Sequence, residues 1–243
     1  MNIKNENLIK VGSLQVLLWR KEVKNFHLNV LPPDGKVRVT IPVDVSDEVV
    51  RAFIASKISW IKKHQNNFQN QLRQSPREYV SGESHYFFGH RYLLEVQEMH
   101  SYPSVSIKNK KKIVLICRDK KNTHHKKKII DKWNREKLRE FLKKKVPIWE
   151  KKIGVKVYDW KIRKMKTKWG SCNPVKSTVN FNLELAKYPE ACIEYIIVHE
   201  LLHLIERKHN DRFKKLLDQY YPKWRQYKDA LNKVILADFN DYK

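Results

Sequence analysis

The sequence lacks the features that mark secreted or membrane-spanning proteins. It has no run of roughly 18 or more apolar residues, and its first residues lack the apolar core of a secretory signal. Only three cysteines occur, Cys117, Cys172 and Cys192, and no two of them form a C-x-x-C pair. The spacing therefore indicates neither a disulfide framework nor a thiolate zinc site. We expect three buried thiols, a cytoplasmic protein and no membrane partner.

Acidic residues are scarce relative to basic ones. The 243 residues include 51 Lys and Arg against 26 Asp and Glu, which gives a net charge of +25. Much of the excess lies in residues 108–168, where 25 basic and 6 acidic residues give +19. Such a surface attracts polyanions, nucleic acid first. The alternative is a lysine-rich solvated helix, because Lys outnumbers Arg and no nucleic-acid-binding motif accompanies the charge.

The first half of the chain has the pattern of β-hairpins with one helix. The length and an apolar content of 41% suffice for a folded core in one or two domains. Strands are expected at residues 23–30 and 36–41, on either side of the turn sequence PPDG at residues 32–35. A helix is expected after Ser46, and a second β-rich stretch covers residues 85–117. No internal repeat is visible.

The polar run at residues 119–128 is the expected boundary between a β-rich region with one helix, residues 1–122, and a second domain, residues 123–243. A basic amphipathic helix should follow it and end or kink at Pro147. The remaining expected elements are strands at 155–162 and 178–185, a helix from Pro189 through the segment HELLH, and helices at 213–220 and 224–235. These elements together predict an α+β fold.

The segment HELLH has the spacing of a metal site. Residues four apart stand on one face of a helix, so His199 and His203 can direct both imidazoles at one metal ion. Glu200 lies about 100° around the helix from His199, where its carboxylate can reach a water molecule without being a ligand. This arrangement predicts a zinc-dependent hydrolase in which Glu200 is the general base and then protonates the leaving amine.

A catalytic zinc ion needs a third protein ligand, and His209 is the nearest candidate. On a continuing helix, His209 would point about 240° away from His203, so the helix must end or turn between them. Enzymes with the longer motif H-E-x-x-H-x-x-G-x-x-H turn at a glycine, whereas this chain has Glu206 there. The rival ligands are acidic residues of the next helix, for example Asp211 or Asp218.

Three motifs together carry a resemblance to a known family. They are the run WGSC at residues 169–172, Asn182 and Leu185 of an N-x-x-L strand, and HELLH followed after five residues by His209. The chain resembles the YgjP-like metallopeptidases, minimal zincins related to the SprT-like proteases, over about residues 162–224. The resemblance implies an active-site helix packed on a small antiparallel sheet, preceded by a region rich in β-hairpins. It also implies one zinc ion on the three histidines.

The WGSC run and Asn182 are candidate substrate-binding residues. Gly170 and Ser171 are small enough to let the main chain approach the site, whereas Trp169 is equally suited to core packing. Asn182 lies on a strand that flanks the cleft in zincins, where it either binds a substrate backbone or is a polar residue at a strand edge. Cys172 is not expected to be a nucleophile, because no base is suitably spaced.

Two positions depart from the family pattern. Lys168 precedes WGSC where arginine is expected, and Asn210 follows the third histidine where serine is usual. Lysine cannot form the bidentate hydrogen bonds of arginine. Neither change affects the expected zinc ligands.

The sequence favours a zinc metallopeptidase that acts on a peptide or protein substrate. The alternative is a nucleic-acid-associated basic protein, including a protease brought to its substrate on DNA, whose main functional surface is the segment 108–168. A hydrolase of non-peptide amides would use the same zinc and glutamate. The sequence does not indicate an oligomeric state.

Overall fold

The computed structural model describes residues 5–31, 35–70 and 77–232. The chain divides into two compact units, Met1–Arg73 and Gln74–Lys243. The sequence placed this division between residues 122 and 123 instead. The two positions differ because the β-rich stretch before residue 122 shares a hydrophobic core with the helix after it, through Ile130 and Trp133.

The first unit is a four-stranded sheet with two helices. Its strands are β1 (Asn5–Val11), β2 (Leu14–Arg20), β3 (His27–Leu31) and β4 (Lys36–Ile41). They lie in the order β1-β2-β4-β3, with β2 and β4 parallel and the other neighbours antiparallel. Alternate residues of β2 and β4 are buried, which is the pattern of a sheet covered on one face. The turn expected at residues 32–35 lies mostly outside the described residues.

The helix expected after Ser46 is two helices. They are α1 (Asp47–Ser56) and α2 (Ile58–Asn70), and they meet at Lys57. Val50 and Ile54 of α1 and Ile61 of α2 are fully buried in the core of the sheet. The buried apolar residues of both helices thus belong to one core with the sheet.

The second unit begins with a sheet of the same design. Its strands are β5 (Ser84–Phe87), β6 (His90–Glu98), β7 (Ser104–Lys108) and β8 (Lys112–Cys117). The order is β5-β6-β8-β7, with β6 and β8 parallel and the outer pairs antiparallel, as in the first unit. In both units a helix begins six residues after the last strand ends. The chain thus contains a structural repeat that its sequence does not display.

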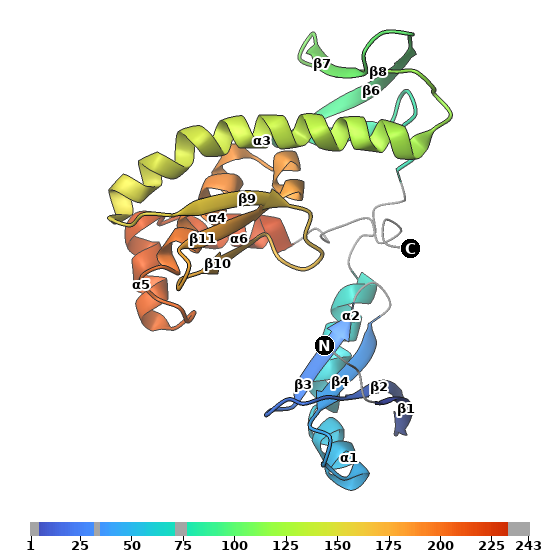
Figure 1. Ribbon diagram of the computed structural model, residues 1–243, viewed down its shortest axis with the longest axis vertical. Coiled ribbons are helices and arrows are strands. Elements are labelled where there is room, and N and C mark those ends of the chain that lie inside the picture. Colours follow the sequence, from blue (N-terminus) through green and yellow to red (C-terminus); the bar gives the residue numbers. More distant parts are fainter. Residues whose placement is uncertain (1–4, 32–34, 71–76, 233–243) are drawn as a thin grey trace. The chain divides into compact units, whose positions relative to one another are not determined.

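Helix α3 (Thr123–Ile153) connects this sheet to the rest of the second unit (Figure 1). Ile130 and Trp133 near its start belong to the core of the sheet, whereas Leu138 and later residues belong to the core that contains α4. The run 119–128 is therefore a linker only in part, since its last six residues are helical.

Helix α3 also continues through Pro147, where the sequence predicted an end or a kink. Pro147 is exposed, and so is Lys143, whose carbonyl loses its helical partner. Water can therefore hydrate that carbonyl. Val146 and Trp149 on either side are buried, and their packing holds the helix to Gly154, which ends it with φ of 78°.

A three-stranded sheet lies beside α4. Its strands are β9 (Asp159–Arg163), β10 (Gly170–Asn173) and β11 (Thr178–Asn182), in the order β10-β11-β9. β11 is antiparallel to β10 but parallel to β9, so the sheet is mixed and not antiparallel as expected. β10 is an edge strand. The fold is nevertheless α+β, as the sequence predicted.

The remaining helices complete the second unit. They are the 3-10 helix η1 (Leu183–Lys187), α4 (Glu190–Leu202), α5 (Asp211–Tyr220) and α6 (Trp224–Asn232). Glu194 of α4 accepts a hydrogen bond from Trp149 Nε1 (2.9 Å) and pairs with Lys145 (2.8 Å), which joins α4 to α3. Among the described helices, none combines the length and apolar character needed to cross a membrane.

Candidate metal centre

Helix α4 carries the first four residues of the HELLH segment, and His203 follows at its C-terminal end. The helix is surrounded by α3, α5, α6 and the three-stranded sheet. Its apolar residues are accordingly distributed around the helix and not confined to one face. His199 and His203 lie one turn apart, at the end of α4 and immediately after it, with ring centroids 4.9 Å apart. A buried helix thus places two imidazoles on one face.

The chain leaves α4 without a glycine. His203 keeps helical angles (φ −66°, ψ −15°), and no residue from His203 to His209 has a positive φ. Leu204 N–H bonds to Leu201 O (3.0 Å), and Glu206 N–H bonds to Leu202 O (2.9 Å), so the last turn tightens and closes.

Glu206, at the position of the missing glycine, supports this exit in two ways. Its carbonyl oxygen lies 3.1 Å from His203 Nδ1, which fixes the ring and leaves Nε2 free. Its carboxylate accepts a hydrogen bond from Lys208 N–H (3.1 Å). The turn that the sequence demanded is therefore made by hydrogen bonds and not by a left-handed residue.

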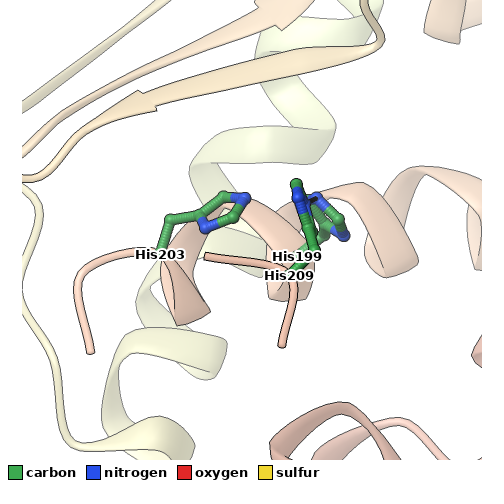
Figure 2. Close-up of side chains that lie close together, drawn as sticks. All are labelled: His199, His203 and His209. Atoms are coloured by element: carbon green, nitrogen blue, oxygen red, sulfur yellow. Dashed lines mark hydrogen bonds between the residues drawn. The ribbon is translucent and has the colours of Figure 1, made fainter. Parts of the chain in front are cut away.

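The turn returns His209 to the other two histidines (Figure 2). His209 Nε2 lies 2.9 Å from His199 Nε2, and one nitrogen of each of the three histidines lies within 4.8 Å of the others. The rival residues point elsewhere: Asp211 pairs with Lys214 (2.9 Å), and Asp218 accepts from Trp224 Nε1 (2.7 Å). Of the described residues, only the three histidines form a candidate metal cluster.

Phe213 forms the support beneath the histidines, a role that the sequence analysis did not assign. It is 1% exposed, and its ring centroid lies 5.0, 4.7 and 4.9 Å from those of His199, His203 and His209. Asn210 places it, because its side chain accepts the Phe213 N–H (3.0 Å) as the cap of α5. In the sequence, Phe213 is an apolar residue three positions after Asn210, a residue type that favours helix N-caps. This spacing was the one sequence feature that could have indicated the position of Phe213.

The electrostatic setting keeps the imidazoles neutral. Burial, with smaller effects of His203 and His209, lowers the pKa of His199 to about 3. Burial also lowers the pKa of His203 and His209. A metal ion binds the neutral form of imidazole, and three such ligands with one open position are the donor set of a catalytic zinc ion. The residues present therefore fit zinc.

Glu200 is buried beside the histidines, with 4% of its surface exposed. Burial raises its pKa to about 8, and the positive charge of Lys168 acts in the opposite direction. A Cβ atom at Gly170 would lie 2.5 Å from Glu200 Oε1 and 2.6 Å from its Cγ. The sequence suggested a close approach at Gly170, and the group that approaches is Glu200.

A cleft of about 360 Å³ opens over these residues. The candidate substrate-binding residues Trp169, Gly170 and Ser171 line it, together with Cys172. Trp169 also packs edge-on against Tyr188, with ring centroids 4.7 Å apart, so it has a packing role as well. Burial and Glu200 raise the pKa of Cys172 to about 12, which agrees with the expectation that it is not a nucleophile.

Asn182 does not face the cleft, which corrects the expectation that it binds substrate. It is fully buried, and its Nδ2 donates to Met165 O and Lys168 O, both at 2.8 Å. Its Oδ1 accepts from Met165 N–H (3.3 Å) and Glu184 N–H (3.2 Å). Asn182 therefore holds the loop that leads into β10.

Comparisons with known proteins give one family and two distantly similar structures. The family model described as YgjP-like, metallopeptidase domain, matches residues 24–234. The metallopeptidase zymogen abylysin of Pyrococcus abyssi is 18% identical, with a TM-score of 0.35, over 37% of this chain and 90% of that chain. The zymogen jannalysin of Methanocaldococcus jannaschii is 22% identical, with a TM-score of 0.34, over 37% and 92%. No curated protein matches.

Proposed function

The chain belongs to the YgjP-like metallopeptidase family, and we propose that it is a zinc-dependent peptidase with His199, His203 and His209 as metal ligands. Glu200 is the general base. The observation that carries this proposal is the convergence of three neutral imidazoles beside a buried carboxylate in one cleft.

The chemistry divides between the metal and the chain. Zinc on the three histidines supplies a Lewis acid that polarises the substrate carbonyl and acidifies water. Glu200 accepts a proton from the attacking water while the water oxygen bonds to the carbonyl carbon. Glu200 then returns that proton to the amide nitrogen as the C–N bond breaks, which releases an amine and a carboxylic acid.

We infer that β10 and the residue before it bind the main chain of the substrate, through Gly170 and Ser171 of the strand and the preceding Trp169. In the part of the chain that the structure describes, β10 pairs only with β11, so its other edge is open to an extended peptide. These residues line the cleft next to Glu200. An added strand would carry a peptide bond along the cleft and past the carboxylate.

Zinc content and peptide cleavage test this function. Wild type is expected to bind one zinc ion and to cleave peptides in a randomised mixture. Mass spectrometry detects the cleavage products. His199→Ala with His203→Ala should lose the metal, whereas Glu200→Gln should keep zinc and lose cleavage. Glu194→Gln, on the same helix but outside the cleft, is the control and should remain active. Wild type without zinc, or a fully active Glu200→Gln, would refute the proposal.

A second candidate function, nucleic-acid binding, is favoured by one exposed face of α3. Lys128, Lys132, Arg139 and Lys143 are exposed, and none forms an ion pair with another described residue. Their spacing places them within an arc of about 60° and along about 22 Å of the helix. Other lysines of the basic segment are neutralised locally, for example Lys137 by Glu140 and Lys164 by Asp131.

Salt-dependent binding to a DNA duplex tests this second function. Reversing the four charges to glutamate is expected to weaken binding at least tenfold and to make the dependence on salt shallower, by about 0.9 in the log–log slope per lost phosphate contact. The matched control reverses four exposed lysines of the first unit, Lys24, Lys36, Lys62 and Lys63. Equal losses in both variants would show that net charge alone, and not this face, binds DNA.

A further inference from the structure

The exposed charges of the cleft all have one sign. Two lysines line it: Lys168, two residues before β10, and Lys228 on α6. The one carboxylate in the lining is Glu200, which is buried. Before any metal is added, the exposed part of the cleft is therefore cationic.

Lys168 is held at one side of the cleft. Its carbonyl oxygen accepts the hydrogen bond from Asn182 Nδ2, which fixes the main chain and leaves the side chain exposed. Its charge reaches the reacting region, since it acts on the pKa of Glu200. It has no ion-pair partner among the described residues.

Lys228 stands on the wall formed by α6. Its Nζ lies 5.6 Å from the ring centroid of Trp224, and that ring is buried and stacked with Tyr195 at 6.5 Å. Its charge acts on His199 and His209. Like Lys168, Lys228 forms no ion pair within the described part of the chain.

We propose that Lys168 and Lys228 select peptide substrates with aspartate or glutamate side chains near the scissile bond. The proposal rests on the peptidase function and adds a substrate class to it. A bound peptide with acidic side chains on both sides of the reacting bond would place a carboxylate near each lysine. An exposed ion pair changes affinity by up to about fivefold, so two pairs support a preference of about tenfold.

Binding measurements separate this specificity from catalysis. The probes are two fluorescent peptides with acetylated and amidated ends and one apolar centre, flanked either by glutamates or by lysines. Zinc-loaded Glu200→Gln is expected to bind the glutamate peptide about tenfold more tightly. Adding Lys168→Glu and Lys228→Glu should reverse the preference. Adding Lys215→Glu and Lys223→Glu, two exposed lysines outside the cleft, is the matched control and should preserve it.

The outcomes distinguish the two proposals. A preference for glutamate that only the cleft substitutions reverse supports the specificity. If the wild type cuts neither these two peptides nor the randomised mixture, the peptidase function fails while the binding preference of the cleft stands. Cleavage of both peptides at similar kcat/KM, with no binding preference, overturns the specificity and leaves the peptidase function standing. Equal effects of the cleft and control pairs would also overturn it, because the net charge would then explain the binding.

Discussion

The main chain of Gly170 lies directly against the side chain of Glu200. A Cβ atom at Gly170 would lie 2.5 Å from Oε1 and 2.7 Å from Cδ of that glutamate, closer than a carbon atom can approach. The strand β10 therefore sets the position of the carboxylate, and only a glycine leaves room for it. This contact gives the WGSC run a physical role in the site.

Gly170→Ala should displace the Glu200 carboxylate while leaving the fold intact. A misplacement of about 1 Å costs on the order of 100-fold in rate, so kcat should fall by about that factor. Zinc content should not change, because the three atoms nearest to the new methyl group all belong to Glu200, which is not a proposed metal ligand. Steady-state kinetics with metal analysis check this. A rate equal to that of wild type would show that the carboxylate position is not critical.

Asn182→Asp should destabilise the protein far more than an exposed substitution of the same kind. The new carboxylate would face Met165 O and Lys168 O in a fully buried position, and the two donated bonds would be lost. A loss of about 3 kcal/mol or more is expected in the free energy of unfolding. The control is Asn173→Asp, where the acceptor role toward Val175 N–H survives. Denaturant titration of both variants measures these losses. Equal losses for Asn182→Asp and Asn173→Asp would contradict the role given to Asn182.

Much of the site could be predicted from the sequence, because its geometry is local. His199, Glu200 and His203 follow from helical spacing, and His209 follows from the need for a third ligand within reach. The way the chain turns back could not be predicted. It depends on the hydrogen bond between Glu206 O and His203 Nδ1 and on a tightened last turn, neither of which has a sequence signature.

The contacts between distant segments were beyond the sequence. Asn182 is polar and follows alternating apolar residues, which is compatible with either a cleft residue or a buried hub. Only the fold shows that the loop before β10 wraps around it. Strand β2, by contrast, could have been predicted from the sequence, because the apolar residues Leu14, Val16 and Leu18 alternate along it. The sequence analysis did not predict this strand.

The repeat of the four-stranded sheet could not be predicted from the sequence for a related reason. The two copies share strand order and the distance to the next helix, but those are properties of pairing and not of residue identity. In β2, β4 and β6 alternate residues are buried and apolar, whereas in β8 Ile113, Val114 and Leu115 are all buried.

Phe213→Leu should weaken zinc binding more than it weakens the fold. Phe213 packs against all three histidine rings, and groups that orient metal ligands typically change metal affinity by about 10- to 100-fold. Competition with a chromogenic zinc chelator measures that affinity. Phe141→Leu, a buried replacement in α3 away from the cleft, is the control and should alter stability only. Equal zinc affinity in both variants would contradict the role given to Phe213.

Pro147→Ala should stabilise the protein. An alanine restores the hydrogen bond to the Lys143 carbonyl and removes the clash of the proline ring, and such changes inside a helix are worth about 1 to 3 kcal/mol. The control is Ile148→Ala, an exposed neighbour 48% accessible to solvent, which should shift stability by about 0.5 kcal/mol or less. Thermal unfolding measures both. A lower Tm for Pro147→Ala would mean that the proline stabilises α3 through the unfolded state.

Stability should fall as the pH is lowered from about 6.5 to about 4, and His85 is a main cause. Burial, with the charge of Arg77, lowers the pKa of His85 from 6.5 to about 4, so the native ring stays neutral while the unfolded ring is protonated. The unfolded state then binds more protons throughout this window, and acid favours unfolding. The shift corresponds to about 2 to 3 kcal/mol of stability, fully present above the unfolded pKa and lost as the pH falls toward 4.

His85→Gln should remove that part of the pH dependence, because glutamine does not titrate. Urea unfolding of the metal-free proteins at pH 7 and pH 4.5 measures the difference, and His199 then contributes equally to both curves. Wild type should lose more stability than the variant between the two pH values. His124→Gln is the control, since that side chain is exposed at the start of α3 and should leave the dependence unchanged. Parallel curves for wild type and His85→Gln would show that the buried ring is protonated in the native state.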